Sequence, residues 1–358
     1  MKNAGMPSPR RNELELLKAL SIVAMILCHP VIRLGIHRAG YEKEFLFFLG
    51  DVILGDYLGV AHAFMFAMGV GVVCSRKNAP AELMRRGLRL YLLGYALNFC
   101  RYGVYALGEG LISGAFEPET AEALFGPDIL QFAGLALLFT GLLKYLKLRE
   151  GHILILGAGL SLIGSAVPFV DTGSYWLNWL LGHLVYTTWD ASCFAFCSWY
   201  VFVAAGLFFG AALRRAADED RFYRRLLAVS GCVMALYLAA TAHFGALFLC
   251  PERVYYALSL PEAAGLLSID LSLLSAFYFL LKRLPAEGLR VPLEMSRNLT
   301  PIYFIHWCIL GFIDSIFCYL LGLVFPWWAV YGIGAALIVV SCRIAKRLTA
   351  RKQAAGAA

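Results

Sequence analysis

The sequence predicts an all-helical integral membrane protein with about ten transmembrane helices and both termini in the cytoplasm. Of its 358 residues, 60% are hydrophobic and only 15% are charged, whereas a soluble domain carries roughly 25% charged residues. The mean hydropathy of +0.70 agrees with that composition. The chain is therefore better divided into membrane spans of about 20 residues than into soluble domains.

Apolar runs of membrane-spanning length recur along the chain, and each in turn is assigned to one helix because about 20 helical residues cross the hydrocarbon core. We place the ten spans at residues 16–35, 56–75, 88–107, 128–147, 152–170, 192–213, 226–248, 263–283, 299–322 and 325–343. An earlier start of the second span is compatible with the apolar residues 45–58, which contain Asp51 and Asp56. A leader (residues 1–15) without an evident cleavage site and a basic tail (residues 344–358) flank one membrane domain at residues 16–343.

The basic residues predict the orientation, because cytoplasmic loops of membrane proteins are enriched in Lys and Arg. With these spans, 26 of the 31 Lys and Arg residues fall on one side of the membrane, and the other side has Arg33, Arg38, Lys43, Arg101 and Arg253. The first side is therefore cytoplasmic, and the predicted location is the cell (inner, cytoplasmic) membrane. Topology also explains the net charge of +7, so no nucleic-acid partner is needed.

The ten cysteines do not suggest a metal cofactor. They are scattered, mostly within the spans, and form no Cys-x-x-Cys pair. Cys193 and Cys197 are one helical turn apart, a spacing that more often reflects packing than a bridge or a metal site.

An intramembrane histidine is the first candidate for catalysis. Lys18 and His29 bracket ten apolar or small residues in the first span. At about 1.5 Å per residue, His29 lies roughly 16 Å along the helix from Lys18 and hence near mid-bilayer. Ionisable groups at that depth are expensive and are candidates for function. A packed histidine bonded to a neighbouring carbonyl is the alternative, and Pro30 frees such a carbonyl.

A cluster of arginines opens the third span. Arg86 and Arg89 are three residues apart and share a helix face, with Arg85 beside them. Paired guanidinium groups near a helix N-terminus suit phosphate binding. The alternative is ordinary topogenic charge, which every inner loop of this chain carries.

For two further histidines and one aromatic segment, the sequence allows two interpretations each. His306, in the ninth span, and His62, in the second, are each either packed or functional. The outer segment at residues 171–190 is rich in Trp and Tyr. It is expected either to lie at the interface as an aromatic belt or to line a cavity. The second arrangement would place Trp176, Asn178 and His183 near a substrate.

Four short segments carry a resemblance to a known family. Residues 14–20 (LELLKAL) precede His29, and residues 64–69 (FMFAMG) are rich in aromatic side chains. Residues 86–89 read Arg-Gly-Leu-Arg, and residues 296–307 (SRNLTPIYFIHW) end in Tyr-x-x-His-Trp. In this order they resemble the motifs of acyltransferase family 3. The chain also looks similar to bacterial relatives of heparan-α-glucosaminide N-acetyltransferase.

The chain departs from the family pattern at three positions. Glu15 stands where the family usually has aspartate, and Met68 stands where serine is usual. Lys18 stands in place of arginine, and lysine keeps the charge but loses the bidentate fork of a guanidinium group.

The resemblance implies transfer of an acyl group from cytoplasmic acyl-CoA, usually acetyl-CoA, to a hydroxyl or amine of a sugar-containing acceptor outside. The implied partners are acyl-CoA, a carbohydrate or lipid-linked glycan and membrane lipids, and a homo-oligomer is left open. On this reading, Arg86, Arg89 and Lys18 bind the donor. His29 takes the acceptor proton or carries the acyl group.

Two further roles follow from the same resemblance. His306 or Tyr303 would stabilise the thioester oxyanion. Trp176 and His183 would hold the acceptor.

Two rival functions fit the same sequence. A transporter or flippase for a small polar solute or a lipid-linked sugar would also use ten spans and buried histidines, although the two halves show no matching repeat. A non-catalytic membrane scaffold or sensor would bind acyl-CoA without turnover.

Overall fold

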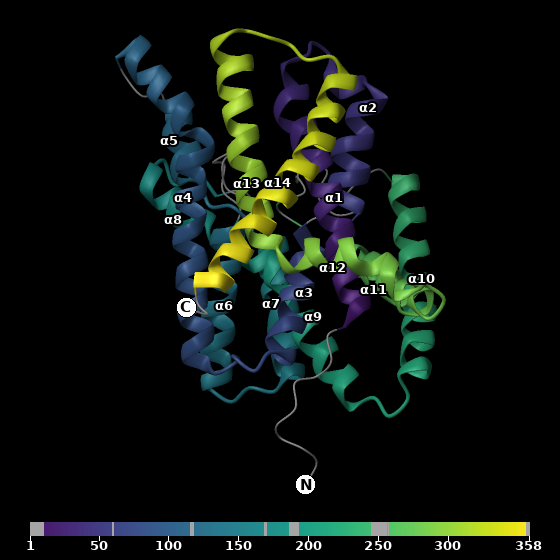
Figure 1. The fold of residues 1–358 in the computed structure, drawn as a ribbon. Coiled ribbons are helices and arrows are strands. Elements are labelled where there is room, and N and C mark those ends of the chain that lie inside the picture. The colour runs from purple at the N-terminus through teal and green to yellow at the C-terminus, as the bar shows by residue number, and fades with distance from the viewer. Residues whose placement is uncertain are drawn as a thin grey trace. The chain divides into compact units, whose positions relative to one another are not determined.

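The computed structural model describes residues 11–58, 61–114, 118–167, 170–185, 193–244, 256 and 258–355. Helices make up its regular structure, and these residues contain no β-strand (Figure 1). The predicted leader residues 1–10, the end of the outer aromatic segment (186–190) and the last tail residues (356–358) lie outside this part of the chain.

Most helices are long. Their bounds are α1 Asn12–Leu34, α2 Phe45–Phe48, α3 Ala61–Cys74, α4 Pro80–Ser113, α5 Pro118–Phe125, α6 Ile129–Tyr145, α7 Glu150–Ala166, α8 Tyr175–Gly182, α9 Phe196–Arg215, α10 Glu219–Phe244, α11 Leu260–Leu281, α12 Arg290–Arg297, α13 Leu299–Ile313 and α14 Trp327–Ala355. Two π-helical segments, η3 (Leu49–Tyr57) and η6 (Asp314–Leu320), follow α2 and α13. Short 3-10 helices occur at Gly35–His37, Tyr41–Lys43 and Ala286–Leu289.

The prediction of an all-helical membrane protein is confirmed. Each of the ten predicted spans falls on a helix, and eight helices in the described residues are long and apolar enough to cross a membrane. The second of these runs over Phe45–Cys74, so it includes the apolar residues before residue 56. The other two predicted spans are α7, which has 17 residues, and α4, whose 34 residues include Arg89, Asn98 and Arg101.

The chain divides into two compact units, each assembled from separate stretches of sequence. Unit 1 comprises Met1–Leu14, Ala61–Tyr95 and Gly126–Phe279. Unit 2 comprises Glu15–Val60, Ala96–Phe125 and Leu280–Ala358.

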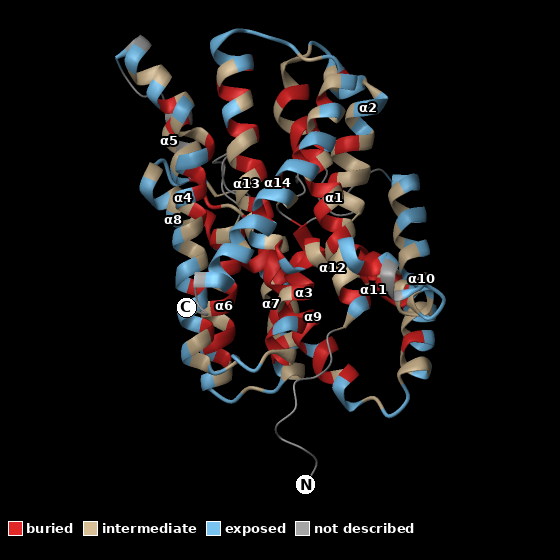
Figure 2. Cartoon of the chain, viewed as in Figure 1, coloured by how far each residue is buried: buried red, intermediate tan, exposed pale blue. Residues whose placement is uncertain are grey.

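Helix α9 forms the centre of unit 1. It is buried along almost its whole length, and α3, α6 and α7 pack around it (Figure 2). Gly69 and Gly206 allow α3 and α9 to approach closely, because a Cβ at either position would overlap backbone atoms of the other helix. Small residues at such crossings are typical of membrane helices, where close packing drives association. In contrast, α10 buries only Tyr223 and Ser230, as expected of a helix that faces lipid.

The start of α6 shows how the sequence sets a local boundary. Asp128 precedes the helix and accepts a hydrogen bond from the Ile129 amide, while its own amide donates to the Gln131 side chain. This capping box satisfies donors that a helix N-terminus leaves without intrahelical partners. It fixes the beginning of the predicted fourth span.

Unit 2 holds α1, α13, η6, α14 and the second half of α4. At the predicted cytoplasmic end of the unit, Lys346 pairs with Glu294, and Thr349 donates to the Asn298 side chain. At the opposite end, Tyr331 donates to the Leu46 carbonyl, and Arg38 donates to the Phe325 carbonyl. These contacts tie α14 to other parts of the unit at both ends.

Candidate active site

A buried pair of histidines lies in the interior of unit 2. His29 of α1 and His306 of α13 are 9% and 0% exposed. His29 Nδ1 lies 2.7 Å from His306 Nε2, and the two rings are inclined by only 12°. The structure therefore brings together the two histidines that the sequence singled out in the first and ninth spans.

The hydrogen bonds of this pair fix the tautomers of the two neutral rings. His306 Nδ1 lies 3.0 Å from the Ile302 carbonyl oxygen, which can only accept, so Nδ1 donates and Nε2 is the acceptor. His29 must then donate from Nδ1 to His306 Nε2. The unprotonated nitrogen of His29 is consequently Nε2, the atom that a base or nucleophile needs.

An aromatic and cationic layer covers His29. The Trp307 ring lies 4.1 Å from the His29 ring between centroids, and the Arg101 guanidinium carbon lies 4.6 Å from the Trp307 ring centroid. Arg101 is 5% exposed, also lies over Tyr102, and donates to the Asn98 side chain at 2.7 Å. A buried cation held by two aromatic faces and an amide is well fixed in position.

One glycine makes this arrangement possible. Gly311 lies one turn beyond Trp307 on α13, and a Cβ there would overlap the backbone of Arg101 on α4. The two helices can approach closely only because residue 311 has no side chain. This approach brings Arg101 to Trp307.

Lys18 lies on the same side of α1 as His29. Eleven residues are close to three full helical turns, so the two side chains share a helix face. Lys18 Nζ forms a salt bridge of 2.9 Å with Glu15, whose other oxygen accepts a hydrogen bond from Ser296. The motif segment at residues 14–20 is thereby joined to the start of the late motif segment.

A second polar network lies at the far end of α1. The buried Asp314 carboxylate contacts Arg33 at 2.6 Å and His37 at 3.0 Å. His37, Asp314 and Cys318 offer possible metal-ligand atoms that all lie within 4.8 Å of one another. Because the guanidinium group of Arg33 already binds Asp314, the buried carboxylate serves here as the partner of a half-buried cation.

A cavity of about 230 Å³ opens beside this network. It lies between α4 and η6, and its polar lining consists of Tyr105, Glu109, Ser315 and Tyr319. Ser315 follows His306 by nine residues, which corresponds to roughly 13 Å of helix toward the predicted outer end. Aromatic faces beside a carboxylate and a hydroxyl suit a hydroxyl-rich ligand.

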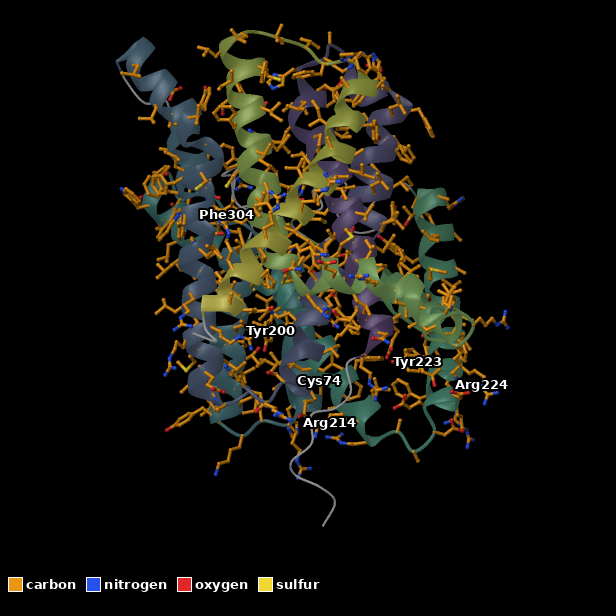
Figure 3. The ribbon with its side chains drawn as sticks, in the orientation of Figure 1. Cys74, Tyr200, Arg214, Tyr223, Arg224 and Phe304 are labelled. Carbon is orange, nitrogen blue, oxygen red and sulfur yellow. The ribbon has the colours of Figure 1, made fainter. Side chains whose placement is uncertain are left out.

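The arginine cluster lies in unit 1, at the start of α4. Arg85, Arg86 and Arg89 are exposed and have no hydrogen bond or ion pair with any described residue. Gly87 faces α6, where a Cβ would meet the backbone of Gly134 and Leu138. Arg214 of α9 donates to the Val73 carbonyl at the end of α3, next to Cys74 (Figure 3). This cationic end of unit 1 is the predicted cytoplasmic end.

The two predicted acceptor residues differ in their surroundings. Trp176 on α8 is 65% exposed. His183 is buried: its Nδ1 donates to the Trp179 carbonyl, and its Nε2 lies 3.1 Å from the hydroxyls of both Tyr91 and Tyr95. Burial lowers the pKa of His183 below its ordinary value, so the ring is neutral. The exposed Trp176, together with Leu177 and Leu180, favours an interfacial helix for this segment.

The remaining histidine of interest, His62, pairs with an acid that the sequence reading did not single out. His62 Nδ1 lies 2.8 Å from the Asp270 carboxylate, and both side chains are fully buried in unit 1. This contact joins α3 to α11.

Comparison with known proteins gives a family. Residues 11–346 match the model of the family 3 acyltransferases, described as an acyltransferase domain. The chain belongs to acyltransferase family 3. Curated proteins provide no match to it. As a multi-pass member of this family, the protein is a membrane-bound acyltransferase that requires an acyl donor and an acceptor.

Sequence reasoning about this family 3 acyltransferase missed Arg101, Asp314 and Asp270, and it assigned no role to Trp307. Arg101, Asp314 and Asp270 fall inside predicted spans, where an ionisable side chain is itself a signal of function. Arg33 and Arg101 were counted only as charges on the outer side.

Proposed function

We propose that this acyltransferase moves an acetyl group from cytoplasmic acetyl-CoA to a hydroxyl or amine of a sugar-containing acceptor on the outer side of the cell membrane. The observation that carries this proposal is the buried, hydrogen-bonded pair of His29 and His306. Their hydrogen bonds leave His29 Nε2 unprotonated in the interior of unit 2. A membrane-embedded base of this kind suits acyl transfer.

His29 acts as the general base in this mechanism. The acceptor oxygen or nitrogen attacks the thioester carbonyl carbon while His29 Nε2 takes its proton. The new bond to carbon forms, the C–S bond breaks, and the CoA sulfur leaves with the proton that His29 returns. His306 positions His29, because it holds the Nδ1 proton and stabilises the imidazolium that forms transiently.

Cationic residues bind the donor. Arg86 and Arg89 are exposed, without protein partners in the described residues, and share a helix face, so both guanidinium groups are available for the CoA phosphates. Lys18 shares the face of α1 that leads to His29 and provides a further positive charge, partly offset by Glu15.

Two separate features, one in each unit, support binding of a sugar-containing acceptor. On an interfacial helix, the exposed indole of Trp176 still offers a flat apolar face for a sugar ring, and His183 holds the end of α8 in place. The cavity lined by Tyr105, Glu109 and Tyr319 has room for about one sugar ring.

The test is acceptor-dependent release of CoA from acetyl-CoA. Purified wild type and His29→Ala are compared with a panel of amino sugars and cell-envelope glycans. We expect the variant to lose about 10²–10⁴-fold in rate, as is typical when a general base is removed. His243→Ala, in which an exposed histidine is replaced, should keep the wild-type rate. Full activity of His29→Ala would contradict the assigned role.

A further inference from the structure

An unsatisfied donor lies beside the histidine pair. Trp307 is 5% exposed, yet its Nε1–H makes no hydrogen bond with any residue in the described part of the chain. Buried polar groups almost always have a partner, and an exception needs an explanation, such as a catalytic role. The corresponding group of Trp327, in the same unit, donates to Glu44. The free N–H is therefore not a general feature of buried tryptophans in this protein.

The position of this indole indicates what it binds. Its ring lies 4.1 Å from that of His29, whereas the ring of Tyr303 lies 6.5 Å away. His306 cannot serve in its place, because both of its ring nitrogens are already engaged. Arg101 lies over the same indole and adds positive charge close to the reaction.

We propose that the Nε1–H of Trp307 is the hydrogen-bond donor that stabilises the oxyanion formed on the acyl carbonyl. The inference rests on the proposed function. When the acceptor adds to the carbonyl carbon, the π-electron pair moves to the oxygen, and the resulting negative charge accepts the hydrogen bond from Trp307. The pair returns to re-form the carbonyl as the C–S bond breaks. A donor that is fixed before the reaction and aimed at developing charge stabilises the transition state more than the substrate.

The test replaces Trp307 with a ring that lacks the donor. Trp307→Phe keeps an aromatic face for His29 and Arg101 but removes the N–H. We expect kcat to fall by about 100-fold or more, as when one oxyanion donor is removed, with KM for acetyl-CoA within about twofold. Trp307→His restores a ring N–H near this position and should recover part of the rate. Trp327→Phe is the matched control and should keep the wild-type kcat.

A binding measurement separates catalysis from structure. A CoA trifluoromethyl ketone, whose hydrate resembles the tetrahedral adduct, should lose about 100-fold in affinity for Trp307→Phe, while the affinity for CoA itself stays unchanged. A purely structural role would weaken both ligands alike and would overturn the assignment.

The outcomes also separate this inference from the proposed function. No acceptor-dependent CoA release by the wild type contradicts the proposed function, and the assignment of Trp307 falls with it. An active wild type that depends on His29, together with a full-rate Trp307→Phe, contradicts only the role of the indole.

Discussion

At the scale of single residues, the hydrogen bonds of the two histidines determine which ring nitrogen of His29 can act as a base. The Ile302 carbonyl sets the tautomer of His306, and His306 in turn sets that of His29. A backbone carbonyl of α13 thus determines, through His306, which nitrogen of His29 on α1 is basic. The equivalent partner in other catalytic arrangements is a carboxylate, which orients the imidazole in the same way.

The hydrogen bond from His29 to His306 predicts that activity survives only if residue 306 is replaced by another hydrogen-bond acceptor. His306→Gln presents a side-chain oxygen to the His29 Nδ1 proton and should retain part of the activity. His306→Ala leaves that proton without a partner, so we expect its kcat to fall by roughly 100-fold or more, since an orienting partner can be worth up to about 10⁴-fold. Measured rates of CoA release check this order. Equal losses in both variants would show that His306 does not orient His29.

At the scale of helices, glycines decide which elements can meet. Gly311 brings α13 against α4, and Gly69 with Gly206 brings α3 against α9. The ends of α2 and α13 continue as π-helical segments, and the buried Asp314 begins the second of them. Such segments are rare and frequently occur at functional sites.

Two glycines on α3 provide a test of this packing. Gly69 faces the α9 backbone, whereas Gly71 is exposed and would place a Cβ in open space. Gly69→Ala should lower the free energy of unfolding by about 1–3 kcal/mol, because the α9 backbone cannot move aside cheaply. Gly71→Ala should leave it unchanged or raise it by up to about 1 kcal/mol through helix propensity. Thermal and denaturant unfolding in detergent measure the difference, and equal stabilities would contradict the close approach.

At the scale of the whole molecule, the two arginines proposed to bind the CoA phosphates and the proposed base belong to different units. Arg86 and Arg89 lie in unit 1, and His29 and His306 lie in unit 2, while α4 runs through both. The transferred group is at one end of CoA, and the phosphates are at the other. Residues that bind the phosphates can therefore be tested separately from residues that act on the thioester.

This division predicts that the arginines act on binding and not on the chemical step. In Arg86→Gln with Arg89→Gln, KM for acetyl-CoA should rise by about tenfold or more, because charge-assisted bonds to phosphate are lost. The kinetics with acetyl-pantetheine, which lacks the nucleotide, should not change. Arg224→Gln with Arg225→Gln removes two exposed arginines elsewhere in unit 1 and is the control; Figure 3 labels the first of them. A rise in KM for both donors would contradict phosphate binding.

The sequence by itself determined the membrane class, the helical fold and the family. These follow from local properties: apolar runs long enough to cross a bilayer, the Lys and Arg asymmetry that predicts orientation, and four motifs in order. Hydropathy also placed His29 and His306 inside spans, where ionisable side chains stand out. Hydropathy could not predict the direct contact between His29 and His306, because these residues are 277 positions apart in the sequence.

Only the tertiary structure decided the chemistry at the histidine pair. Which nitrogen of His29 is free depends on a bond between α1 and α13, and the position of Arg101 depends on the absence of a side chain at Gly311. That the Trp307 N–H has no acceptor among the described residues is visible only once the neighbouring groups are placed. The fold class follows from the free energy of transferring each segment into lipid, and that free energy depends on the segment's own composition. The site depends on distances between segments remote in sequence, which packing alone sets.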